Sequence, residues 1–153
     1  MQKFTEILND MLVAVYHKIL VVEEDFLKRG IGAGLTIREM HLIEYVGKAG
    51  AQGRTLSEIA DFLGVARSSV TVSVRKLEQM GYLMKSGCTV DGRVIYVTLT
   101  RDGRRVYIHH MRFHVLMVQE LESELGEEEK NALIQAIIKL DRFFEKSIEA
   151  SAT

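Results

Sequence analysis

The sequence predicts a mainly α-helical protein that carries one β-hairpin. Three observations support this fold class. Apolar residues recur every three or four positions through most of the 153 residues, as in amphipathic helices. The chain contains no proline, so no proline interrupts a long helix. Residues 94–99 depart from the helical spacing, because there the apolar side chains alternate with the period of a β-strand.

Long helices are expected towards both ends of the chain. Residues 4–28 show an apolar stripe sustained for about seven helical turns, and Gly30 follows it as a helix stop. Helical spacing resumes in residues 106–125 and again in residues 127–150, where three acids occupy the first turn. Those acids favour a helix start there, since they face the positive end of the helix dipole.

Three shorter helices are expected between residues 36 and 81. Thr36 with Glu39, and Thr55 with Glu58, have the spacing of a capping box, so each threonine predicts a helix start. The first of these helices runs to about Lys48. The second ends at Gly64, and a third follows it and ends at Gly81.

A hairpin is expected after these helices. Residues 82–85 form one strand, residues 94–99 form the other, and the link SGCTVDGR contains the glycines and aspartate that a tight turn requires. The predicted order is therefore α-α-α-α-β-β-α-α.

The third short helix has an unusual polar face. Val70, Val74 and Leu77 form one apolar stripe, whereas the other face carries small hydroxyls and cations with one acid, Glu78. A short helix, a glycine turn and a second helix of this kind make a helix-turn-helix motif. Small polar side chains allow such a helix to approach the major groove of DNA closely.

Positive charge is concentrated around this motif. Residues 66–105 carry a net charge of +5, although the formal net charge of the chain is −1. The remaining residues therefore carry −6. A basic centre between acidic flanks indicates one surface that faces a polyanion.

Two segments, TLSEIADFLGVARSSVTVSVRKLEQMGYL (55–83) and DGRVIYVTLTRDG (91–103), resemble the MarR family of winged helix-turn-helix transcriptional regulators. The resemblance implies a single domain over residues 1–153, with a winged helix-turn-helix in 36–105 and dimerisation helices in 1–30 and 106–150. It also implies an obligate homodimer that acts as a repressor on a pseudo-palindromic operator. Two residues depart from the family pattern: Ala66 replaces the usual Ser or Thr cap, and Gly92 replaces a common second arginine.

The predicted DNA contacts fall into three groups. Base edges are assigned to four residues at the start of the polar helix, phosphates to four residues around it, and the minor groove to the wing. In that order the residues are Arg67, Ser68, Ser69 and Thr71; Thr55, Ser57, Arg75 and Lys76; and Arg93.

Two effectors are considered for a cleft between the dimerisation helices and the DNA-binding part. The segments VVEEDFLKRG, IREMHLIEYVGK and RFHVLMV resemble repressors of fatty-acid synthesis, which answer to acyl chains on acyl carrier protein. Zinc is the alternative, because an acid and three histidines offer oxygen and nitrogen ligands at positions that resemble the zinc-responsive branch. The expected cleft residues are Met40, His41, His110, His114 and Met117, and the expected metal ligands are Glu23, Glu24, His41, His110 and His114.

Other classes of function are less well supported. No glycine-rich phosphate loop or nucleophile elbow occurs, so an enzyme is not expected. The single cysteine, Cys88, cannot form a disulfide within the chain, and neither a secretory signal nor a membrane span is evident, so we expect a cytoplasmic protein. Oxidant sensing by Cys88 and a winged helix that binds protein instead of DNA remain alternatives.

Overall fold

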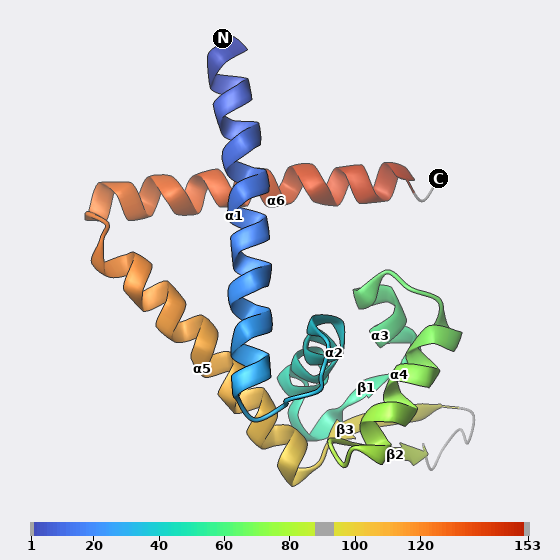
Figure 1. The fold of residues 1–153 in the computed structure, drawn as a ribbon. Helices are drawn as coiled ribbons and strands as arrows, with labels where there is room; N and C mark the ends of the chain where they lie inside the picture. Colours follow the sequence, from blue (N-terminus) through green and yellow to red (C-terminus); the bar gives the residue numbers. More distant parts are fainter. Residues whose placement is uncertain (1, 88–93, 152–153) are drawn as a thin grey trace. The chain divides into compact units, whose positions relative to one another are not determined.

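The computed structural model describes residues 2–87 and 94–151. This part of the chain contains six α-helices and a three-stranded sheet (Figure 1). The helices are α1 (Gln2–Arg29), α2 (Ile37–Lys48), α3 (Leu56–Leu63), α4 (Arg67–Gln79), α5 (Arg101–Ser123) and α6 (Glu127–Ser151). The strands are β1 (Arg54–Thr55), β2 (Leu83–Gly87) and β3 (Ile95–Leu99), and a short 3-10 turn covers Gly50–Gln52. The predicted fold class is confirmed.

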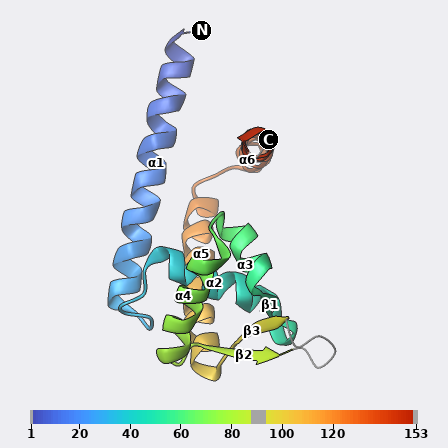
Figure 2. The same ribbon diagram turned by 90° about the vertical axis from the view of Figure 1, so that its right-hand side faces the viewer.

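The chain divides into two compact units, and the boundary falls inside α5. Residues up to Phe113 form the first unit, and residues from His114 form the second. The first unit has a hydrophobic core to which α2, α3, α4 and the sheet all contribute (Figure 2). Met40, Ile59, Val74 and Val97 lie in this core with no exposed surface.

Both predicted capping boxes are present. The hydroxyl of Thr36 accepts a hydrogen bond from the backbone N–H of Glu39 at 3.2 Å, and the Glu39 carboxylate accepts one from the Thr36 N–H at 2.9 Å. Thr55 and Glu58 make the same reciprocal pair at the start of α3. The predicted end of α3 is also confirmed, since Gly64 adopts a left-handed backbone conformation with φ 62°.

The sheet has one strand more than expected. All its pairings are antiparallel, in the order β1-β3-β2, and the hairpin register places Lys85 opposite Val97. The additional strand, β1, is only two residues long and pairs with Val97 and Tyr96. Gly53 precedes it with φ 70°, and a Cβ there would clash with the Val97 carbonyl oxygen. Residues 88–93 of the hairpin link, including Cys88 and Arg93, lie outside the described residues, whereas Ser86 and Gly87 belong to β2.

The fifth helix begins five residues earlier than the spacing predicts. Thr100 caps α5, because its hydroxyl accepts a hydrogen bond from the backbone N–H of Gly103 at 3.0 Å. The same hydroxyl donates to the Gly81 carbonyl oxygen at 2.6 Å, just after α4. One threonine therefore joins the end of α4, the exit of β3 and the start of α5.

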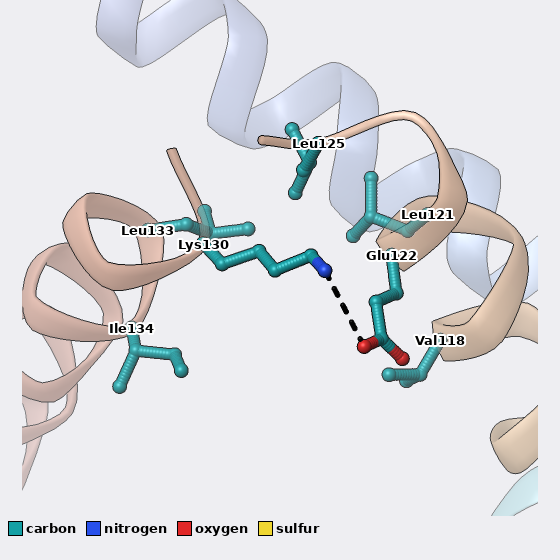
Figure 3. Close-up of a pocket in the computed structure, with 7 residues that line it drawn as sticks. All are labelled: Val118, Leu121, Glu122, Leu125, Lys130, Leu133 and Ile134. Carbon is teal, nitrogen blue, oxygen red and sulfur yellow. Dashed lines mark hydrogen bonds and ion pairs between the residues drawn. The ribbon is translucent and has the colours of Figure 1, made fainter. Parts of the chain in front are cut away.

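The second unit consists of the end of α5 and the whole of α6. A pocket of about 220 Å³ lies between these helices and is lined mainly by leucine, isoleucine and valine (Figure 3). Lys130 crosses its mouth towards Glu122 with an Nζ–Oε1 distance of 3.5 Å. No described residue of α6 is buried. Within the described ranges, no helix is both long and apolar enough to cross a membrane.

Candidate nucleic-acid interface and histidine cluster

Helix α4 packs on the first unit by one narrow face. Val70, Val74 and Leu77 are 1% exposed or less, so the predicted apolar stripe is confirmed. The left-handed Gly64 turns the chain between α3 and α4, and the N–H of Val65 closes the end of α3 on the Ala60 carbonyl at 3.1 Å. The two helices thus form a helix-turn-helix in which the rest of the α4 surface faces outwards.

The start of α4 has no side-chain cap. Ala66 occupies the N-cap position, no side chain there accepts a hydrogen bond from the first turn, and that turn contains no acid. The first backbone N–H groups of a helix point along the axis and carry partial positive charge. Arg67 adds a full positive charge at this end. This end of α4 therefore favours an anion.

The residues predicted to read base edges are exposed along this face. Arg67, Ser68, Ser69 and Thr71 are all accessible to solvent. The Thr71 hydroxyl donates a hydrogen bond to the Arg67 carbonyl oxygen at 3.0 Å. Thr71 therefore offers a base an acceptor more readily than a donor.

The residues predicted to bind phosphates differ in their surroundings. Ser57 and Arg75 are exposed, whereas the half-buried Thr55 uses its hydroxyl in the capping box with Glu58. The Lys76 Nζ lies 2.7 Å from the Glu39 carboxylate. This ion pair was not foreseen, because 37 residues separate its partners. The phosphate contacts themselves stay predictions.

A cluster of carboxylates and imidazoles lies on α1, α2 and α5, with Glu23 and His110 buried and His41 and Glu44 partly exposed. His110 Nε2 lies 2.8 Å and His41 Nε2 lies 3.0 Å from the same oxygen of Glu23. His110 Nδ1 lies 3.4 Å from a Glu44 carboxylate oxygen. Glu23 and His110 are 2% and 1% exposed. Imidazole nitrogens and carboxylate oxygens gathered in this way are the ligand types that zinc accepts.

The structure brings some of the predicted metal ligands together and leaves one apart. Glu24 is exposed and pairs with Lys28 on its own helix at 2.9 Å. His114 lies one helical turn after His110 on α5 and is half-buried. Glu44 was missed, although it follows His41 by three residues on α2, a spacing that places both side chains on one helix face.

The residues predicted to line the effector cleft differ in their burial, and the cleft itself stays a prediction. Met40 belongs to the core and has no exposed surface, whereas Met117 is 36% exposed. A pocket of about 390 Å³ lies beside the start of α2. It is lined by Glu24, Lys28, Gly34, Leu35, Thr36, Ile37 and Arg38, and none of the five predicted cleft residues lines it.

The helix-turn-helix of α3 and α4, followed by the β2–β3 wing, defines a winged helix-turn-helix protein. Residues 33–94 match the sequence model of the MarR family (MarR_2). The crystal structure of Streptococcus pneumoniae FabT in complex with DNA is similar over 91% of this chain and 96% of that chain, with 32% identity and a TM-score of 0.87.

The chain therefore belongs to the MarR family of transcription regulators, whose members are not enzymes. The Staphylococcus aureus MepR–DNA complex has the same fold at 21% identity over 86% of this chain and 94% of that chain, with a TM-score of 0.72. An uncharacterised HTH-type regulator of Bacillus subtilis (strain 168), YfiV, is 28% identical over 93 residues. That match covers 60% of this chain and 58% of YfiV, so the chain spans little more than half of this curated relative.

Proposed function

We propose that the chain is a cytoplasmic, homodimeric repressor that binds a pseudo-palindromic operator through α4 and the wing. The observation that carries this proposal is the exposed face of α4, which combines an uncapped start, Arg67 and small hydroxyl side chains. The crystal structure of FabT in complex with DNA supports the same class of ligand.

The proposed contacts follow from the chemistry of the α4 surface. A phosphate satisfies the open N–H groups at the start of α4, and the Arg67 guanidinium forks onto guanine O6 and N7 in the major groove. Ser68 and Ser69 are short enough to let the α4 backbone approach base edges. Arg75 contacts the backbone phosphates, and Arg93 enters the adjacent minor groove.

Exposed apolar surface supports the homodimer. Ile137 is 54% exposed, Phe143 62% and Ile148 70%, and all three lie on α6, which buries none of its described residues. Helix α1 likewise exposes Phe4, Met11 and Tyr16. Many large apolar side chains exposed along one helix are unusual on a monomer and mark an interface. A twofold dimer would place two copies of α4 on half-sites about one helical turn of DNA apart.

Selection from a random duplex library, followed by affinity measurement, tests the DNA-binding function. Arg67→Ala should weaken binding to the selected duplex by about 5- to 150-fold, the range expected for one lost bidentate base contact of about 1–3 kcal/mol. Arg29→Ala is the matched control, because Arg29 is exposed on α1 and pairs with Asp25. Failure to select any duplex would favour the protein-binding alternative.

Two effectors remain candidates for control of this binding. The resemblance of residues 21–30, 37–48 and 112–118 to repressors of fatty-acid synthesis favours an acyl chain presented by acyl carrier protein. The cluster of Glu23, His41 and His110 favours zinc as the second candidate. In either case, the bound effector would change the separation of the two α4 helices.

Equilibrium dialysis with zinc distinguishes the two effectors. Zinc control predicts about one zinc per chain in wild type, loss of that zinc in Glu23→Gln, and its retention in Glu24→Gln. The two glutamates are adjacent, but Glu23 is buried against histidines whereas Glu24 pairs with Lys28. Wild-type protein without bound zinc would remove the metal candidate, and native mass spectrometry would then test for an acyl species.

A further inference from the structure

One ion pair joins the recognition helix α4 to the start of α2. The Lys76 Nζ on α4 lies 2.7 Å from Oε1 of Glu39 on α2. Glu39 is only 8% exposed as a residue, whereas 48% of the Lys76 side chain is accessible. The pair therefore has one buried partner, the carboxylate, and one partner close to the proposed DNA surface.

Both oxygens of Glu39 have partners. Oε1 accepts from Lys76 at 2.7 Å and Oε2 accepts from the Thr36 backbone N–H at 2.9 Å. Burial alone would raise the pKa of Glu39, but the hydrogen bonds from Lys76 and Thr36 outweigh it and lower the pKa below its usual value. Glu39 is therefore ionised at neutral pH.

Breaking this pair leaves the buried Glu39 carboxylate without a cation, with the Thr36 N–H still donating to it. A carboxylate that loses its cation in a partly buried site costs far more than an exposed ion pair contributes. If Lys76 left Glu39 to contact a DNA phosphate, the buried Glu39 carboxylate would lose its cation. Arg75 lies beside Lys76 on α4, is exposed, and makes no hydrogen bond or ion pair with any residue in the described ranges.

We propose that Glu39 is a positioning residue for DNA binding, which orients α4 through Lys76 and keeps the Lys76 charge away from the phosphates. This inference rests on the proposed function of α4. Two neighbouring cations then have different roles: Arg75 contacts the phosphate backbone, whereas Lys76 holds the recognition helix α4 in place.

The salt dependence of DNA binding tests this assignment. The logarithm of the binding constant falls with the logarithm of salt concentration by about 0.9 for each phosphate that a cation neutralises. Arg75→Gln should therefore make the slope shallower by about 0.9 per bound chain. Lys76→Gln should leave the slope as in wild type. An equal change of slope in both variants would overturn the proposal.

A second variant tests positioning and does not depend on Lys76→Gln being stable. Glu39→Gln keeps an acceptor for the Thr36 N–H, so the capping box survives while the charge is lost. Thr36 itself is unchanged, so its hydroxyl still accepts from the backbone N–H of residue 39. We expect Glu39→Gln to reduce the preference for the selected duplex over a scrambled duplex by about tenfold, or about 1.4 kcal/mol.

The double variant Glu39→Gln/Lys76→Gln completes a double-mutant cycle. If the two residues act through each other, its loss of preference should equal that of Glu39→Gln alone. Additive losses, or an unchanged preference in Glu39→Gln, would overturn the proposal. Wild-type protein that binds no duplex in a salt-dependent way would instead remove the proposed function, and the inference with it.

Discussion

Single side chains at the two capping boxes decide where α2 and α3 begin. Glu58 shows this clearly, because its carboxylate accepts hydrogen bonds from both the backbone N–H and the hydroxyl of Thr55, at 2.7 and 2.9 Å. These two hydrogen bonds lower the pKa of Glu58 below its ordinary value of 4.5, with a smaller contribution from Arg54. The ionised form of Glu58 therefore stabilises the start of α3.

The lowered pKa of Glu58 predicts a pH-dependent stability. A carboxyl whose pKa is lower in the folded than in the unfolded chain stabilises the fold above the unfolded pKa, and that stabilisation is lost as pH falls through the folded pKa. Urea unfolding at neutral pH should show wild type more stable than Glu58→Gln by at most about 1 kcal/mol, given solvent screening. The difference should shrink as pH falls below 4.5. A constant difference across that range would contradict the prediction.

Gly103 is required by a close backbone approach. A Cβ at this position would clash with the Tyr82 carbonyl oxygen, so an alanine must push the start of α5 away from Tyr82, which directly precedes β2. We expect Gly103→Ala to lower the free energy of unfolding by about 3 kcal/mol or more, as strain at a packed backbone does. Gly87→Ala is the control, because a Cβ there meets no atom of the described residues within 4 Å, and it should change stability by less than about 0.5 kcal/mol.

At the scale of elements, α4 separates residues that hold the fold from residues that meet a ligand. Leu77 has no exposed surface, whereas Val72 is 69% exposed on the same helix. Leu77→Ala should lower the free energy of unfolding by about 2–5 kcal/mol through the cavity that it leaves. Val72→Ala should change it by less than about 0.5 kcal/mol. Chemical denaturation of both variants checks the orientation of α4, and equal losses would contradict it.

Local signals in the sequence predicted the helices well. The spacing of Thr55 and Glu58 placed the start of α3, and Gly64 placed its end, because both signals act within one turn of the backbone. Strand β1 was missed because two residues show no periodicity, and only pairing with β3 makes them a strand. The start of α5 was placed too late because the capping hydroxyl of Thr100 precedes the first apolar residue of the stripe.

The candidate site was predictable only in part, because pairings between residues far apart in sequence again leave no local signal. Periodicity in α4 predicted which of its residues are exposed, since burial follows the helical repeat. The partners of Lys76 and His110 are 37 and 87 residues away in sequence. Pairs at such separations depend on the tertiary fold and leave no periodic signal. The charge of Lys76 suggested a phosphate contact, and its ion pair with Glu39 could be seen only in the folded chain.

At the scale of the whole molecule, the apolar surface of α6 predicts association. Ile137 lies on the apolar stripe of α6 and is 54% exposed. If a second chain covers it, a charged side chain at this position would be buried in the interface and would weaken the dimer. Light scattering after gel filtration should show a dimer for wild type and a shift towards monomer for Ile137→Glu. Lys139→Glu is the control, because residue 139 lies about 200° further round the helix. A monomeric wild type would contradict the prediction.

The uncapped start of α4 also has a kinetic consequence. The amide protons of Arg67 and Ser68 are not held by a side-chain cap, because Ala66 provides none. They should exchange with deuterated solvent rapidly in the free protein and slowly once a phosphate accepts them. Deuterium uptake at the first turn of α4 would then report directly the fraction of protein that has bound the duplex, without a label on the nucleic acid.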